Sequence, residues 1–252
     1  MVESFSLQKE QLIQQDHNSH ILSHKLKVCI IGATGAVGKE MVRYAKVNPN
    51  VEEITLIVRK VLPEWENISQ SGCKVNFICK EDFSNLSDCV EKLQDYEIFL
   101  CALGTLRKYG IANFIRVDHD YPVEFAKLAS KCKNVQYFGL ISAQGSNAKS
   151  CLLYPKTKGR AENDVGSMHN FKYYSIFRPG LLVNRDNDVR CMERFFACLP
   201  CVPRVTARRV GQVAVEDAIQ KLINKNEAKQ QEGRVIISHS QIHRLARQYQ
   251  LP

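Results

Sequence analysis

Residues 27–39 read K-V-C-I-I-G-A-T-G-A-V-G-K and constrain the fold more than any other stretch. An apolar run at residues 28–31 is followed by three glycines at three-residue intervals, Gly32, Gly35 and Gly38, and then by apolar residues at helical spacing. A buried strand, a glycine turn and a helix in this order open a nucleotide-binding unit. There, the first glycine permits a tight turn, the second lets a diphosphate approach the backbone, and the third lets the helix pack on the strand. We therefore predict a dinucleotide site here; the alternative is an ordinary strand–helix turn.

The rest of the chain continues this alternation. Further strands are expected at residues 54–58, 75–79, 98–103, 136–142 and 173–177, and the longest helices between them at residues 111–132 and 154–169. Such alternation implies right-handed crossovers and a parallel sheet covered on both faces. Beyond residue 180 the pattern is less regular, with helices expected at 190–198, 207–224 and 241–248 and a strand at 234–238. The sequence thus predicts an α/β protein: a single doubly wound Rossmann domain over residues 25–252, with an irregular C-terminal lobe from about 181, after a polar leader or surface helix at residues 1–24.

Composition narrows the function. At 252 residues and 44% hydrophobic, the chain can bury one substantial core, and no apolar run is long enough for a membrane span. Residues 1–24 resemble neither a secretion signal nor a transit peptide, and the ten scattered cysteines are typical of reduced thiols, so we expect a cytoplasmic protein. The basic residues behind the net charge of +9 are spread along the chain, and the sequence contains no nucleic-acid-binding motif. An anionic cofactor explains it as well, and we expect no nucleic-acid partner; a monomer is compatible with the sequence.

The second strand indicates which cofactor is bound. In an NAD-binding unit, an acidic residue about 20 positions after the glycines holds the ribose hydroxyls. Here, the strand at residues 54–58 runs into Arg59 and Lys60 instead. A guanidinium can bind a 2′-phosphate that a carboxylate would repel. This pattern favours NADP(H) over NAD(H); the alternative is two solvated basic residues at a strand end.

A tyrosine and a lysine form the candidate catalytic pair. Of nine tyrosines, only Tyr154 has a lysine four residues on, Lys158, and this spacing places both on one helix face. A nearby ammonium favours the phenolate of a tyrosine, which can then exchange a proton with a carbonyl oxygen at neutral pH. Ser142, at the end of the fifth strand, could hydrogen-bond the same oxygen or be an ordinary strand-end hydroxyl. The tyrosine–lysine spacing alone is a weak signal, and its place after a fifth strand makes it specific.

With these features in place, the chain resembles the atypical short-chain dehydrogenase/reductases, and more closely the Tat-interactive-protein oxidoreductase family. The matching motifs are I-I-G-A-T-G-A-V-G, I-V-R-K, C-A-L-G-T, R-V-D-H-D-Y, Y-P-K-T-K-G and S-I-F-R-P-G. The resemblance implies NADPH, with its diphosphate at Thr34, Gly35, Ala36 and Val37 and its ribose phosphate at Arg59 and Lys60. It further implies cofactor contacts at Asp82 (near the adenine), Leu103, Gly104, Tyr154, Lys158, Leu182 and Arg190. It also implies that Tyr154 and Lys158 are the acid/base pair.

The chain departs from the family pattern at one position, because Ser142 is followed by Ala143 where related proteins tend to carry a second serine. Two functions therefore stay open. The first is an NADPH-dependent reductase of a small carbonyl compound. The second is an NADPH-binding regulator that acts through protein partners such as nuclear-transport factors, which would also allow a nuclear or nuclear-envelope location. We expect no metal: the run Asp118, His119 and Asp120 is interpreted as solvent-facing or as capping neighbouring loops.

Overall fold

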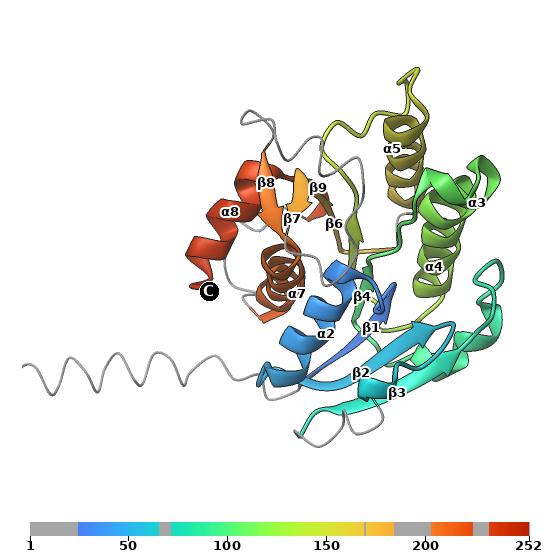
Figure 1. Cartoon of the computed structure of the whole chain (residues 1–252). Helices are drawn as coiled ribbons and strands as arrows, with labels where there is room; N and C mark the ends of the chain where they lie inside the picture. The colour runs from blue at the N-terminus through green and yellow to red at the C-terminus, as the bar shows by residue number, and fades with distance from the viewer. Residues whose placement is uncertain (1–24, 66–71, 169, 184–202, 224–231, 252) are drawn as a thin grey trace, which may run out of the picture.

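A computed structural model of the protein describes residues 25–65, 72–168, 170–183, 203–223 and 232–251. At the centre lies a seven-stranded sheet in the order β3-β2-β1-β4-β5-β6-β9, in which every neighbouring pair is parallel (Figure 1). The strands are β1 (Leu26–Ile31), β2 (Val51–Val58), β3 (Lys74–Cys79), β4 (Ile98–Cys101), β5 (Tyr137–Ile141), β6 (Tyr173–Arg178) and β9 (Gly233–Ser238). The order reverses between β1 and β4, and a doubly wound sheet binds its ligands at such a switch point. The predicted doubly wound Rossmann fold is confirmed.

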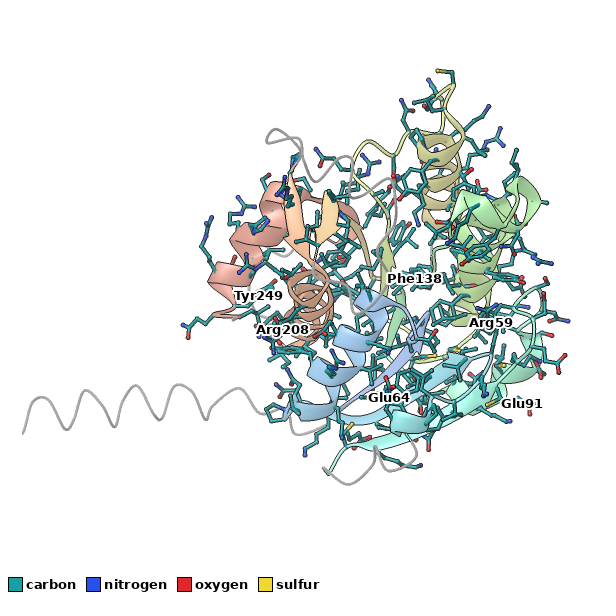
Figure 2. The ribbon with its side chains drawn as sticks, viewed as in Figure 1. Arg59, Glu64, Glu91, Phe138, Arg208 and Tyr249 are labelled. Atoms are coloured by element: carbon teal, nitrogen blue, oxygen red, sulfur yellow. The ribbon has the colours of Figure 1, made fainter. Side chains whose placement is uncertain are left out.

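Helices cover both faces of this sheet (Figure 1). One face carries α2 (Ala36–Val47), α7 (Ala207–Ile223) and α8 (His239–Gln248), and the other carries α4 (Tyr121–Ser130) and α5 (Leu153–Gly166). Along β1, Val28 and Ile30 face the first core while Cys29 and Ile31 face the second. Because both faces are buried there, the strand is continuously apolar from Val28 to Ile31 rather than alternating. Phe138 of β5 lies in the second core, among the side chains drawn in Figure 2.

Asp217 of α7 is the centre of a buried polar network on the first face. Its Oδ2 accepts hydrogen bonds from the Tyr137 hydroxyl at 2.7 Å, the Ser175 hydroxyl at 2.8 Å and the Lys221 ammonium at 2.9 Å. Burial, together with the Asp217 carboxylate, raises the pKa of the Tyr137 phenol. The network ties α7 to β5 and β6, because Tyr137 and Ser175 belong to those strands.

The structure differs from the sequence pattern in several elements. The single helix predicted at residues 111–132 is α3 (Ile111–Ile115), a π-helical turn η6 (Arg116–Asp120) and then α4. The fourth strand ends at Cys101, so residues 102–105 form a loop. A separate parallel pair, β7 (Leu181–Val183) and β8 (Arg204–Thr206), was not predicted. Short 3-10 turns complete the described elements: η1 (Pro63–Trp65), η3 (Ser87–Cys89), η4 (Glu91–Leu93) and η5 (Arg107–Tyr109).

Some predictions are not tested. The leader at residues 1–24 and the helix at residues 190–198 lie outside the described residues, and the division between the Rossmann domain and its C-terminal lobe stays a prediction. Within the described part of the chain, no helix combines the length and the apolar character that crossing a membrane requires.

Candidate functional site

The glycine turn after β1 is shaped by contacts that a side chain would break. Gly32 has a φ of +80°, and a Cβ on it would stand 2.6 Å from the carbonyl carbon of Ala102 in the loop after β4. A Cβ on Gly38 would stand 2.7 Å from the Cα of Ala33 and closer still to the Gly32 oxygen. Gly32 thus makes the tight turn and Gly38 the close helix–strand contact that the sequence predicts.

Gly35 differs from the other two glycines. A Cβ on Gly35 would meet only the Gly32 oxygen, at 3.4 Å, and its φ of −79° suits any residue. The protein itself therefore does not require a glycine there. Gly35 caps α2 without a side-chain hydrogen bond, and the first turn of α2 holds no acidic residue. The amides and the positive dipole end of α2 are thus available to an anion that approaches the bare backbone.

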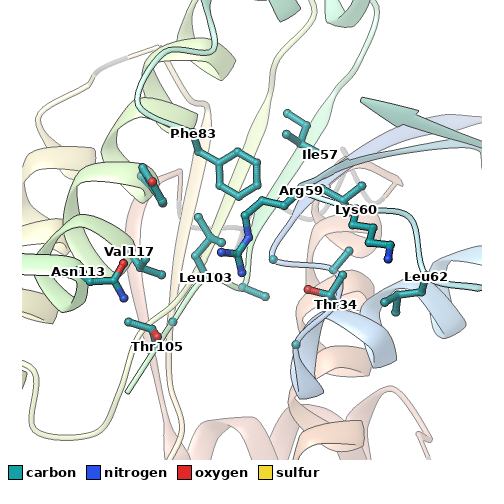
Figure 3. Close-up of a pocket in the computed structure, with 17 residues that line it drawn as sticks. Thr34, Ile57, Arg59, Lys60, Leu62, Phe83, Leu103, Thr105, Asn113 and Val117 are labelled. Carbon is teal, nitrogen blue, oxygen red and sulfur yellow. The ribbon is translucent and has the colours of Figure 1, made fainter. Parts of the chain in front are cut away.

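A cavity of about 500 Å³ opens at this turn. Its walls come from the ends of β1, β2 and β4 and from α3, η6 and the start of α4; Figure 3 labels several of the lining residues. The lining residues are Gly32, Ala33, Thr34, Gly35, Ile57, Val58, Arg59, Lys60, Leu62, Phe83, Ala102, Leu103, Gly104, Thr105, Asn113, Val117 and Tyr121. The structure therefore brings together seven of the predicted cofactor residues: Gly32, Thr34, Gly35, Arg59, Lys60, Leu103 and Gly104.

Arg59 and Lys60 supply the positive charge of this cavity. Both are exposed at the end of β2, and Figure 3 shows the Arg59 side chain pointing toward Leu103. Neither side chain has a hydrogen-bond or ion-pair partner among the described residues, and no carboxylate lines the cavity there. A cavity lined by two uncompensated cations and by bare amides at the start of a helix suits a ligand with several phosphate charges.

Asp82 does not line the cavity but holds a residue that does. Its carboxylate accepts hydrogen bonds from the Ser84 amide and from the Tyr121 hydroxyl, both at 2.6 Å. These hydrogen bonds from Ser84 and Tyr121 lower the pKa of Asp82 to about 2. The Tyr121 ring meets the Phe83 ring edge-on, with centroids 5.4 Å apart. Asp82 thus orients two aromatic residues of the apolar end of the cavity.

The tyrosine–lysine pair lies on α5. Tyr154 stands in the first turn, 39% exposed, with its ring tilted against that of Phe114 at a centroid distance of 5.9 Å. One turn later, Lys158 is buried, and its Nζ donates a hydrogen bond to the Ile141 carbonyl at 3.1 Å. The phenol is close enough to contribute to the raised pKa of Lys158. Neither side chain lines the 500 Å³ cavity.

Ser142 is engaged elsewhere. Its hydroxyl donates a hydrogen bond to Glu162 Oε1 at 2.5 Å and lies 3.0 Å from the Ser146 hydroxyl. Glu162 in turn holds Arg178 in a two-point ion pair, with Nε to Oε1 at 2.9 Å and Nη2 to Oε2 at 2.5 Å. The structure thus places the Ser142 hydroxyl in a buried network that joins β5, β6 and α5. Its catalytic role stays a prediction.

The remaining predicted residues in the described part of the chain do not line the cavity. Val37 and Gly38 are buried on α2, Ala36 is partly buried in its first turn, and Leu182 is partly buried in β7. Only backbone groups of Ala36 and Val37 are in a position to meet a phosphate at the start of the helix. Arg190 lies outside the described residues.

Asp118 is a buried residue that the sequence pattern misplaced. It was expected to face solvent or cap a loop, and the first half of that expectation is wrong, because Asp118 is only 2% exposed. It does cap a loop: its Oδ2 accepts the Thr105 amide hydrogen bond at 2.8 Å. Its Oδ1 lies 3.6 Å from Lys158 Nζ. The π-helical turn, a feature frequent at functional sites, is what points this carboxylate inward, and no helical periodicity reveals it.

Comparisons with known proteins define the class. Residues 27–113 match the family model described as semialdehyde dehydrogenase, NAD binding domain. The fold is similar to that of Gre2 from Candida albicans, solved in complex with NADPH, with a TM-score of 0.60 over 84% of this chain and 77% of that chain. At 13% sequence identity this likeness shows the shared fold. The chain is an atypical short-chain dehydrogenase/reductase, a class built on a nicotinamide-dinucleotide-binding fold.

Within that class, two relatives identify the family. Protein HTATIP2 of Rattus norvegicus is 32% identical over 72% of this chain and 78% of its own length. Protein FMP52, mitochondrial, of Candida albicans is 35% identical over 77% of this chain and 88% of its own length. The chain belongs to the family of HTATIP2 and FMP52, so the predicted family is confirmed.

The expected cytoplasmic or nuclear location is wrong. Relatives in Candida albicans, Lodderomyces elongisporus and Scheffersomyces stipitis are named mitochondrial proteins, which points to mitochondria instead. The expectation rested on scattered cysteines and on the composition of residues 1–24. Unpaired cysteines are compatible with either compartment, and the composition of residues 1–24 argues only against N-terminal targeting signals of the usual composition.

Proposed function

We propose that this protein is an NADPH-dependent oxidoreductase that reduces a small carbonyl compound. The observation that carries the choice of cofactor is Arg59, an uncompensated guanidinium in the cavity at the end of β2. A 2′-phosphate carries about two negative charges and offers oxygens that a guanidinium binds bidentately. At the neighbouring glycine turn, the bare Gly35 backbone and the start of α2 fit the diphosphate. The residues present therefore fit the phosphorylated dinucleotide better than the unphosphorylated one.

The proton that accompanies reduction is assigned to Tyr154. When bound, NADPH supplies a hydride to the carbonyl carbon. The Tyr154 hydroxyl donates its proton to the carbonyl oxygen, and the ammonium of Lys158 one turn below stabilises the phenolate that remains. The exposure of Tyr154 at the start of α5 supports this role, because a substrate can reach its hydroxyl from solvent.

The cofactor assignment is tested with Arg59→Glu. The substitution removes a charge-assisted contact and sets a carboxylate against the 2′-phosphate, so we expect the Kd for NADPH to rise about 100-fold. The Kd for NADH should change by no more than about threefold, because NADH lacks that phosphate. Both are measured by fluorescence titration. Arg244→Glu is the matched control, since it makes the same charge change at an exposed position of α8. Equal losses for the two dinucleotides would contradict the assignment.

The catalytic assignment is tested with Tyr154→Phe in a screen of carbonyl compounds that follows NADPH oxidation. Removal of the proton donor should reduce kcat by about 10²–10⁴-fold, while the Kd for NADPH stays unchanged because Tyr154 does not line the cofactor cavity. Full activity in the Tyr154→Phe variant would move the proton donor to another residue.

One observation favours a second candidate, a cofactor-binding regulator with little turnover. The Ser142 hydroxyl, expected to assist Tyr154, is hydrogen-bonded to Glu162 instead, and Ala143 cannot replace it. Such a protein would act through protein partners whose binding depends on the bound dinucleotide. Tight NADPH binding by the wild type, without oxidation of NADPH by any compound in the screen, would favour this candidate over the enzyme. The names of the fungal relatives support a mitochondrial location for either function.

A further inference from the structure

A buried ion pair connects the wall of the cofactor cavity to the lysine of the tyrosine–lysine pair. Asp118 Oδ1 and Lys158 Nζ are 3.6 Å apart, with the side chains only 3% and 4% exposed. Burial of two charges is costly unless each has further polar partners. Here, Lys158 also donates a hydrogen bond to the Ile141 carbonyl, and Asp118 accepts one from the Thr105 amide. The ion pair is therefore part of a hydrogen-bonded network rather than an isolated contact.

The partners of this ion pair belong to different parts of the site. Thr105 lines the cofactor cavity in the loop after β4, next to Gly104, where a Cβ would lie 3.5 Å from Asp118 Oδ1. Lys158 lies one helical turn below Tyr154 on α5. One carboxylate thus contacts the cavity wall with one oxygen and the lysine with the other. A displacement of residues 104–105 would therefore also shift the Asp118 carboxylate relative to Lys158.

We propose that Asp118 is a positioning residue that fixes the cofactor loop at Thr105 and keeps the ammonium of Lys158 charged and in place below Tyr154. The inference rests on the proposed function, since it assigns Lys158 the support of the Tyr154 phenolate. Asp118 itself touches neither the reacting carbonyl nor its proton.

The charges around Lys158 support this role. The groups that act on it are Asp118 from the π-helical turn, Tyr154 from its own helix and Cys101 from β4. Burial alone would lower the pKa of Lys158, but the Asp118 carboxylate, with smaller contributions from Tyr154 and Cys101, raises it. Removal of the carboxylate charge leaves burial as the dominant effect, and Lys158 then loses its proton at a lower pH.

Asp118→Asn separates the two contacts of the residue, because the amide oxygen can still accept the Thr105 hydrogen bond while the charge is lost. We expect the titration midpoint of Lys158, followed by lysine ¹³Cε NMR and assigned with Lys158→Arg, to move about 1–3 pH units toward acid. The Kd for NADPH should change by no more than about threefold. The kcat for a carbonyl substrate should fall about 10- to 100-fold, with the alkaline limb of its pH profile moved in the same direction. Asp120→Asn, on the same turn but exposed, is the matched control and should leave the Lys158 midpoint unchanged.

A second variant covers the case in which Asp118→Asn does not fold. Asp118→Glu keeps the charge but lengthens the side chain, so it should retain the Lys158 midpoint and release the Thr105 amide, which is seen as faster hydrogen exchange at Thr105. An unchanged Lys158 midpoint in Asp118→Asn, or unchanged Thr105 exchange in Asp118→Glu, would overturn the proposal. The two NMR readouts do not need turnover. An inactive wild type would therefore count against the proposed enzyme, while the midpoint and the exchange rate still decide the role of Asp118.

Discussion

The two glycines at the start of α2 offer a sharp separation of folding from cofactor binding. In Gly38→Ala, the new methyl group would meet backbone atoms of Gly32 and Ala33, so α2 must retreat from β1. Overpacking of this kind costs about 3 kcal/mol at the upper end of its usual range, and the higher helix propensity of alanine offsets about 1 kcal/mol. The net loss of about 2 kcal/mol lowers Tm by roughly 4–8 °C in a chain of this size.

Gly35→Ala should behave in the opposite way. Its methyl group meets only one protein atom at an ordinary distance, and the backbone conformation suits alanine. The loss of a favourable cap residue and the gain from a less flexible unfolded chain are each about 0.5–1 kcal/mol, so Tm should change by less than about 2 °C. The same methyl group occupies the space through which a diphosphate would approach the backbone. We therefore expect NADPH affinity to fall at least about tenfold.

The assay compares Tm by calorimetry with the Kd for NADPH by fluorescence titration in both variants. We expect Gly38→Ala to have a lower Tm, and Gly35→Ala to keep the Tm of the wild type but to bind NADPH more weakly. If Gly35→Ala binds NADPH as tightly as the wild type, the diphosphate does not lie at this turn, and the cofactor site has been placed wrongly.

Two further predictions concern groups outside the glycine turn. The pKa of Asp82 is lowered to about 2, so its hydrogen bond from Tyr121 contributes stability above about pH 4 that is lost as the pH falls toward 2. The difference in unfolding free energy between the wild type and Tyr121→Phe should therefore shrink over that pH range. A constant difference would contradict this prediction. Asp217→Ala leaves Tyr137 and Lys221 without their buried partner and should lower the free energy of unfolding, measured by urea denaturation, by roughly 3 kcal/mol. The double variant Asp217→Ala with Lys221→Met should recover part of this loss.

Local periodicity carried most of the fold prediction. The strands of the sheet and the helices α2, α5, α7 and α8 could be predicted from apolar spacing, because apolar residues recur at regular spacing on the buried face of each element. The π-helical turn did not follow, because apolar spacing over five residues is too short to distinguish a π turn from an α-helix. The β7–β8 pair did not follow either. Three-residue strands are too short to show a period, and their pairing joins residues more than twenty positions apart.

For the site, the sequence indicates positions that depend on a place along a strand, but not contacts that depend on a distant partner. Arg59 was assigned from its place at a strand end, and the structure puts it in the cavity. Ser142 could not be separated from an ordinary strand-end hydroxyl, because its partner Glu162 lies twenty residues away on α5. The burial of Asp118 likewise depends on Thr105 and Lys158, from two other segments. Hydrogen bonds of this kind carry no signature in a single sequence.

The pairing of β6 with β9 bears on how the protein is made. β9 forms the edge of the sheet beside β6, although more than fifty residues separate them along the chain. During synthesis, β6 therefore leaves the ribosome with one row of its backbone hydrogen-bonding groups unmatched until residues 233–238 have emerged. A polypeptide released early would keep that exposed edge, an open template for pairing with another chain. Completion of this edge of the sheet thus depends on β9, the last of the described strands along the chain.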